Sequence, residues 1–138
     1  MEEFHFQFSY RVGVADINYG GHVANSAVLN FFQDARISYF ANLGPYSELE
    51  LGGCGLIMPE ARVLFRREMF LGDQLQIGVK SLDVKRSGWV MEYRIERRGE
   101  LTAEGETQLR CFNYATRKLC RIPAEFRARL SDFEGLSR

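Results

Sequence analysis

The chain has 138 residues, of which 46% are hydrophobic and 13% are aromatic, so it has the means to bury a substantial core as one domain, residues 1–138. Its 18 basic residues balance its 18 acidic ones, so no overall field would attract nucleic acid or an anionic membrane, and we expect neither as a partner. No stretch approaches the roughly 20 apolar residues that span a bilayer, and Met1 to Phe4 lack the pattern of a secretory signal, so a soluble, cytoplasmic protein is expected.

The first predicted element is a strand over residues 4–12, where apolar and polar side chains alternate strictly. A polar turn follows, Asp16-Ile-Asn-Tyr-Gly-Gly-His22-Val-Ala-Asn25, which gathers a carboxylate, amides and an imidazole around two glycines. Where such a turn opens onto a helix, these side chains lie beside unpaired backbone N–H groups. We therefore expect a functional site at this turn.

A long apolar helix is predicted next, with Asn25 or Ser26 as its N-cap and its end at Gly44-Pro45. Apolar side chains cover most of its circumference and leave one polar stripe through Asn30, Asp34 and Ser38. A helix this apolar is expected to be buried.

Four more strands are expected over residues 56–69, 74–84, 89–97 and 101–115, joined by tight turns. Pro59 interrupts the first of them and forces an edge position or a bulge there, with Glu60 at the irregular point. The remaining tail predicts a short terminal helix that begins at Pro123.

This element order predicts an α+β architecture in which an antiparallel five-stranded sheet wraps around one long central helix. A single helix covers one face of such a sheet, and the other face also carries apolar side chains such as Leu64. We expect another subunit to cover that face, in a homodimer or homotetramer.

Three cysteines, Cys54, Cys111 and Cys120, are odd in number and lack close pairing such as C-x-x-C. This pattern is typical of reduced, structural thiols and not of a disulfide framework or a zinc site. No metal is therefore expected.

The element order, the chain length and the segment Asp16-x-Asn18-x-x-Gly21-His22-Val23-x-Asn25 resemble the hotdog-fold acyl-CoA thioesterases of the 4-hydroxybenzoyl-CoA thioesterase type. Their signature is D-x-D-x-x-G-H-V-N-N or a looser version of it. The resemblance implies a hotdog fold and hydrolysis of an acyl-CoA thioester to free acid and CoA, without a cofactor. Non-catalytic acyl-CoA binders and enoyl-CoA hydratases or dehydratases share this scaffold and stay open as alternatives. The acyl group and its carrier, CoA or an acyl carrier protein, also stay open.

The chain departs from the signature at Asn18, which falls on the aspartate that is catalytic in the family. Asparagine can orient water or a carbonyl group, but it cannot accept a proton. Asp16, Glu60 or Asp34 could supply the missing carboxylate. Glu60 stands in an apolar run, where it could be a buried base or pair with an arginine. Asp34 lies on the polar side of the predicted helix and could simply pair with Arg36 there or face solvent.

The remaining site residues follow from the turn and from local charge. His22 is expected to hydrogen-bond a thioester carbonyl or to fix the turn, and N–H groups near Gly21 to Val23 to polarise the thioester oxygen. Lys80 and the pairs Arg66-Arg67 and Lys85-Arg86 are candidates for holding the phosphates of CoA. The predicted catalytic residues are Asp16, Asn18, His22 and Glu60. The predicted substrate-binding residues are Tyr19, Gly21, Val23, Asn25, Asp34, Arg66, Arg67 and Arg86.

Overall fold

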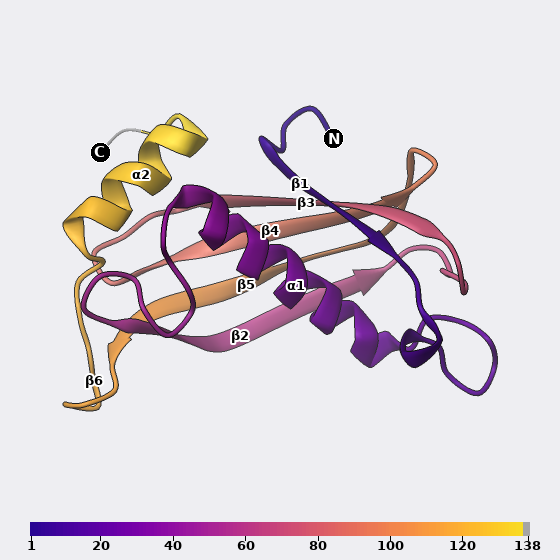
Figure 1. Cartoon of the computed structure of the whole chain (residues 1–138), viewed down its shortest axis with the longest axis horizontal. Coiled ribbons are helices and arrows are strands. Elements are labelled where there is room, and N and C mark those ends of the chain that lie inside the picture. The colour runs from indigo at the N-terminus through magenta and orange to yellow at the C-terminus, as the bar shows by residue number, and fades with distance from the viewer. Residues whose placement is uncertain (137–138) are drawn as a thin grey trace.

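The computed structural model describes residues 1–136, so the last two residues of the predicted domain and tail lie outside the described part. Its elements, in chain order, are β1 (Phe6–Arg11), the short 3-10 helix η1 (Val14–Asp16), α1 (Asn25–Leu43), β2 (Gly55–Phe65), β3 (Gln74–Leu82), β4 (Gly88–Arg97), β5 (Glu100–Asn113), β6 (Lys118–Leu119) and α2 (Ala124–Glu134). Five long strands form one antiparallel sheet in the order β1-β3-β4-β5-β2, and the two-residue β6 adds to β5. Helix α1 lies across one face of this sheet (Figure 1). The predicted α+β hotdog architecture is confirmed.

Helix α1 is buried along the side that faces the sheet, as its apolar composition predicts. Phe32 stacks on Tyr93 of β4 with ring centroids 4.4 Å apart. Gly105 of β5 permits this approach, because a Cβ atom there would lie 2.8 Å from Cε2 of Phe32. The glycine therefore sets how closely the helix can pack on the sheet.

Two details of α1 differ from the prediction. Its N-cap is Ala24, which has no side chain able to cap the helix, and Asn25 is already the first helical residue. Arg36 is buried under the helix, where it donates to the hydroxyl of Tyr93 at 3.0 Å and pairs with Glu48 at 3.2 Å. A cation can be buried here because two partners replace much of its hydration.

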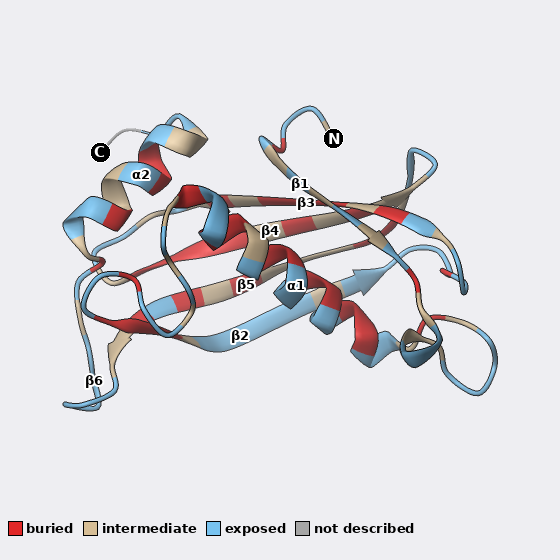
Figure 2. Ribbon diagram, viewed as in Figure 1, coloured by how far each residue is buried: buried red, intermediate tan, exposed pale blue. Residues whose placement is uncertain are grey.

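Strand β2 is the outermost strand on one side of the sheet, and Pro59 falls within its irregularity between Ile57 and Glu60. The predicted edge position and bulge are thus confirmed. Because nothing covers an edge strand in a single chain, most of β2 is exposed (Figure 2). Glu60 is exposed as well, so of its two alternatives the buried base is wrong.

The face of the sheet away from α1 is charged. Ion pairs link neighbouring strands across it, among them Arg62–Glu106 at 3.3 Å and Lys80–Glu92 at 3.6 Å. An apolar outer face was the reason for expecting a second subunit, and the structure does not show one there. Leu64 is exposed on this face, but its neighbours there are mostly charged. Other exposed apolar side chains lie on β2 and α1, and include Leu29, Ile37, Met58 and Phe65.

Helix α2 confirms the predicted terminal helix, with Pro123 as its N-cap. It packs on the end of α1 through Phe126, whose ring meets those of Phe40 and Trp89. Its last residue, Glu134, accepts hydrogen bonds from the hydroxyl of Tyr39 at 2.5 Å and from the backbone N–H of Ser81 at 3.0 Å. These contacts join α2 to both α1 and β3.

The two ends of the molecule are formed by different elements. Helix α2 and β6 lie at one end, and the loop between η1 and α1 lies at the other (Figure 1). Among the described helices, none is long and apolar enough to cross a membrane.

Candidate functional site

A cleft of about 330 Å³ opens between the start of α1 and the end of β2. It brings together side chains from the polar turn and from a second segment more than forty residues later in the chain. Its lining consists of Asn18, His22, Val23, Asn25, Val28, Phe65, Arg66, Arg67, Glu68 and Met69. Six of these residues are predicted site residues.

Backbone pairing holds the two segments side by side. His22 forms an antiparallel bridge with Phe70, and the N–H of Val23 donates to the carbonyl of Met69 at 2.8 Å. Strand β2 ends before this point, whereas the sequence predicts that it continues to residue 69. The segment after β2 is therefore free to turn toward the loop that carries His22.

Asn18 organises the loop that leads to His22. Its side-chain oxygen accepts hydrogen bonds from the N–H groups of Gly20 at 2.9 Å and His22 at 3.3 Å. Its backbone N–H donates to the carbonyl of His22 at 2.7 Å. Gly21 has a φ of 85°, which only glycine adopts at little strain. Asn18 therefore acts as a turn residue, and its oxygen is already engaged.

His22 meets a carboxylate that the sequence analysis does not identify. Its Nδ1 lies 2.7 Å from Oε2 of Glu68, and its ring lies 5.5 Å from that of Phe70. Glu68 lies off the direction of a ring N–H, so the contact is a close electrostatic one, an ion pair whenever the imidazole carries a proton, and not an aligned hydrogen bond. In the sequence, Glu68 stands in a charged run at the end of a predicted strand, and no local signal distinguishes it from a surface residue.

Unpaired N–H groups are found at the first turn of α1. The N–H groups of Asn25 and Ser26 have no acceptor within the helix, and no side chain caps this end. The N–H groups of Gly21, His22 and Val23, by contrast, donate to Asn18 or to Met69. The start of α1, with its positive dipole end, is thus the place where the cleft can stabilise a negative oxygen.

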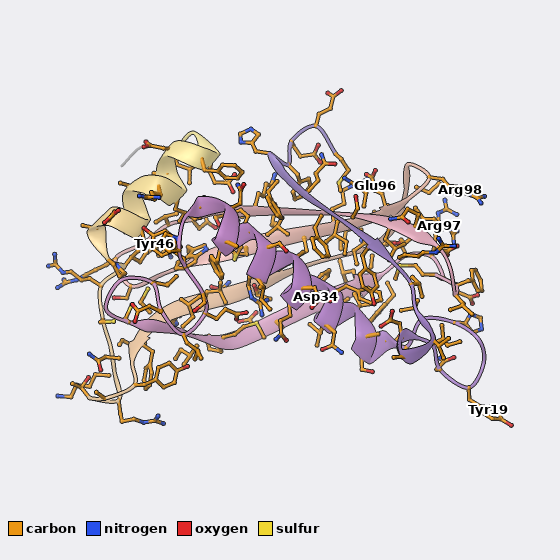
Figure 3. All side chains as sticks on the ribbon, viewed as in Figure 1. Tyr19, Asp34, Tyr46, Glu96, Arg97 and Arg98 are labelled. Carbon is orange, nitrogen blue, oxygen red and sulfur yellow. The ribbon has the colours of Figure 1, made fainter. Side chains whose placement is uncertain are left out.

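Asp16 and Asp34 do not line the cleft. Asp16 accepts hydrogen bonds from the hydroxyl of Tyr10 at 2.5 Å and from the N–H of Gly13 at 2.9 Å. The hydrogen bond between Tyr10 and Asp16 raises the pKa of Tyr10 to about 12. The pKa of Asp34 is raised by partial burial and, secondarily, by the charge of Asp16. Asp34 lies on the open side of α1 (Figure 3).

Four other predicted site residues, among them Gly21 of the turn, also lie outside the cleft lining. Glu60 is on the exposed part of β2, and Arg86 lines cavities at the α2 end of the molecule. Tyr19 stands at the tip of its loop, fully exposed and directed away from the protein (Figure 3). Arg66 and Arg67 line the cleft and pair with Glu104 at 3.0 Å and Glu100 at 3.3 Å.

Comparison with known proteins places this site in context. The model of the thioesterase-like superfamily matches residues 12–130. A thioesterase from Thermus thermophilus, solved with coenzyme A and zinc, is 29% identical, with a TM-score of 0.87 and full coverage of both chains.

Two further solved structures are similar in fold. A 1,4-dihydroxy-2-naphthoyl-CoA thioesterase from Synechocystis is 20% identical, with a TM-score of 0.84 over 92% of this chain and 96% of that one. A gentisyl-coenzyme A thioesterase is 22% identical, with a TM-score of 0.81 over 90% and 98%. A search of curated proteins finds no match.

Proposed function

We propose that this chain, which belongs to the thioesterase-like superfamily and is a thioester hydrolase, cleaves acyl-coenzyme A esters to a free acid and coenzyme A. The observation that carries this proposal is the cleft, where the ion pair of His22 and Glu68 stands beside the uncapped start of α1. The similar thioesterase from Thermus thermophilus, which was solved with coenzyme A, supports the choice of carrier.

In the proposed reaction, the free ring nitrogen of His22 removes a proton from a water molecule as the water oxygen attacks the thioester carbon. The Glu68 carboxylate stabilises the imidazolium that forms. When the carbon–sulfur bond breaks, the imidazolium returns the proton to the thiolate, so that water is consumed and acid and thiol are released. Asn18 keeps His22 in place by holding its loop.

The negative oxygen of the tetrahedral intermediate would be stabilised at the start of α1. Asn25 and Ser26 supply backbone N–H groups there, and the side chain of Asn25 also lines the cleft. The positive end of the helix dipole adds to these donors. Val23, Val28 and Met69 give the cleft its apolar wall for the acyl group.

The phosphates of coenzyme A would be held by Arg66 and Arg67, which line the cleft and are largely exposed. Their pairs with Glu104 and Glu100 are surface ion pairs, worth about 0–1 kcal/mol, so a phosphate can replace the carboxylate at little cost. Arg86 lies at the opposite end of the sheet, and it could contact the same ligand only from a second chain.

A homodimer is proposed on different grounds from those of the sequence. The outer edge of β2 has N–H and C=O groups that no described strand pairs. Phe65 of β2 and Leu29 of α1 are 48% and 40% exposed. We propose that β2 of a second copy pairs antiparallel with this edge and covers both side chains. Light scattering tests the dimer and its further pairing into a homotetramer, and a monomer mass would refute both.

The proposed activity is tested with short, medium, long and aromatic acyl-CoA esters and a reagent that detects free thiols. Thiol release with at least one ester is expected. Esters that bind without releasing thiol would refute hydrolysis, and a change in enoyl absorbance without thiol would indicate water addition instead. The variant Glu92→Gln, which removes an outer-face carboxylate far from the cleft lining, is the control for charge.

A further inference from the structure

Seven basic residues gather at the α2 end of the molecule, and we refer to them as the basic end. They come from the turn before β4, the end of β5, the β5–β6 hairpin, the segment that leads into α2 and α2 itself. The seven are Lys85, Arg86, Arg110, Arg117, Lys118, Arg121 and Arg127. They span forty-three positions of sequence, so only the fold brings them together.

The charges of this net-neutral chain are distributed unevenly. Among the residues that the structure describes, eight Lys and Arg side chains form ion pairs, and none of these eight belongs to the basic end. The seven residues of the basic end form no ion pair within the described part of the chain. Asp83 is the one carboxylate among the described residues that line its cavities. The result is a local positive surface on a neutral protein.

Two cavities and several hydrogen bonds give the basic end a defined shape. Two cavities, of about 420 and 670 Å³, share Lys85 and Arg86 in their walls. Arg127 donates to the carbonyl of Lys85 at 2.7 Å, and the N–H of Ile122 donates to the carbonyl of Arg86 at 3.0 Å. Exposed apolar side chains, such as Leu119, stand among the cations. Arginine mixed with apolar groups is typical of protein interfaces.

The distance between the basic end and the cleft limits which cleft a ligand bound at the basic end can reach. Strand β2 runs from one to the other, and its 11 residues extend about 35 Å. A phosphopantetheine arm, about as long as five extended residues, reaches roughly 18 Å. Antiparallel pairing of two β2 edges would place the basic end of one chain next to the cleft of the other. A carrier docked on one chain could then reach the cleft of its partner.

We propose that the basic end docks an acidic carrier protein that presents its acyl thioester on a phosphopantetheine arm. This inference rests on the proposed thioester hydrolysis and identifies a macromolecular form of the substrate. The reaction is the same: water supplies the oxygen of the acid and the proton of the released thiol. Seven cations without ion-pair partners among the described residues, from five segments, form a wider surface than the three phosphates of one coenzyme A need, and a protein with an acidic face matches it.

The test compares two double variants with the same change in net charge. Arg110→Glu/Arg121→Glu reverses two exposed cations of the basic end, neither of which makes a side-chain hydrogen bond in the described structure. Arg11→Glu/Arg98→Glu reverses two exposed, unpaired cations elsewhere and is the control. Each is assayed with one acyl group on three carriers: an acidic acyl carrier protein, coenzyme A and pantetheine. Binding of the fluorescently labelled carrier protein is measured separately by anisotropy.

We expect Arg110→Glu/Arg121→Glu to lower kcat/KM for the acyl carrier protein by at least about tenfold, because steering charges change association rates by factors of 10 to 1,000. The rate with acyl-pantetheine should stay within about twofold of wild type, and the control variant should change neither rate. The affinity for the carrier protein, measured by anisotropy, should fall by a similar factor in this variant. In the wild type this affinity should fall as the salt concentration rises.

Two results would overturn the docking proposal. An equal loss with acyl-CoA and acyl carrier protein would mean that the surface holds the nucleotide of coenzyme A, and an equal effect of both double variants would mean that only net charge matters. Failure of hydrolysis is distinguishable: if no carrier releases thiol but charge-dependent binding of the carrier protein persists, the docking surface stands and the proposed function falls.

Discussion

The contact between His22 and Glu68 allows a quantitative prediction of how much each side chain contributes to kcat. His22→Gln removes the proposed base, which is typically worth a factor of 10² to 10⁴ in kcat. Glu68→Gln removes only the charge that stabilises the imidazolium. Both side chains are partly in solvent, at 38% and 63% exposure, so the dielectric constant of water applies to their 2.7 Å contact. The interaction is then about 1.5 kcal/mol, which corresponds to roughly a tenfold fall in kcat.

The assay is steady-state thiol release by the two single variants, the double variant and Glu92→Gln as the control. Because Glu68 acts through His22, the double variant should be no slower than His22→Gln alone. If Glu68→Gln costs as much as His22→Gln or more, Glu68 is itself the base. If His22→Gln keeps full kcat, the pair does not activate the water, and the reasoning from their contact fails.

Three further predictions concern the loop and the core. In Asn18→Asp a carboxylate replaces an amide whose oxygen already accepts hydrogen bonds from two backbone N–H groups, so kcat should change by less than about tenfold. A larger gain in kcat would show that the catalytic carboxylate of the family had been missing. Tyr39→Phe deprives Glu134 of its 2.5 Å hydrogen bond and should lower the free energy of unfolding by about 1.5–3 kcal/mol in urea titration; an unchanged value would refute the role of this contact. The hydrogen bond to Asp16 raises the pKa of Tyr10 to about 12, above that of an unfolded tyrosine, so its contribution to stability is complete below about pH 10 and is lost as the pH rises toward 12. Urea titrations at several pH values should show this loss in the wild type and a smaller one in Tyr10→Phe.

Local pattern was sufficient for much of the fold. Strict alternation over residues 4–12 predicted β1, because side chains of a strand point alternately to two faces. Gly44 and Pro45 marked the end of α1, and Pro59 predicted the irregular edge strand, because proline cannot donate a ladder hydrogen bond. Each of these inferences depends on neighbours in sequence.

Part of the site could be predicted in the same way. The turn from Asp16 to Asn25 was recognised as a site because its polar residues and glycines lie together in the sequence, and Asn18, His22 and Asn25 do line the cleft. Asp16 was chosen on the same evidence, yet its carboxylate is engaged with Tyr10 and Gly13. Residue type and spacing gave the position of the turn but not the direction of each side chain.

The tertiary structure decided which groups meet across the sheet. Glu68 approaches His22 only because β2 ends where the loop before α1 crosses it, and the two residues are forty-six positions apart. Glu60 is exposed because β2 is at the edge of the sheet, and the seven cations of the basic end meet because β4, β5 and α2 share one end of the molecule. Periodicity fixes which side of its own element a residue occupies, but strand order and register determine its neighbours from other elements. That is why the sequence located the turn, while the carboxylate that completes it was found only in the folded chain.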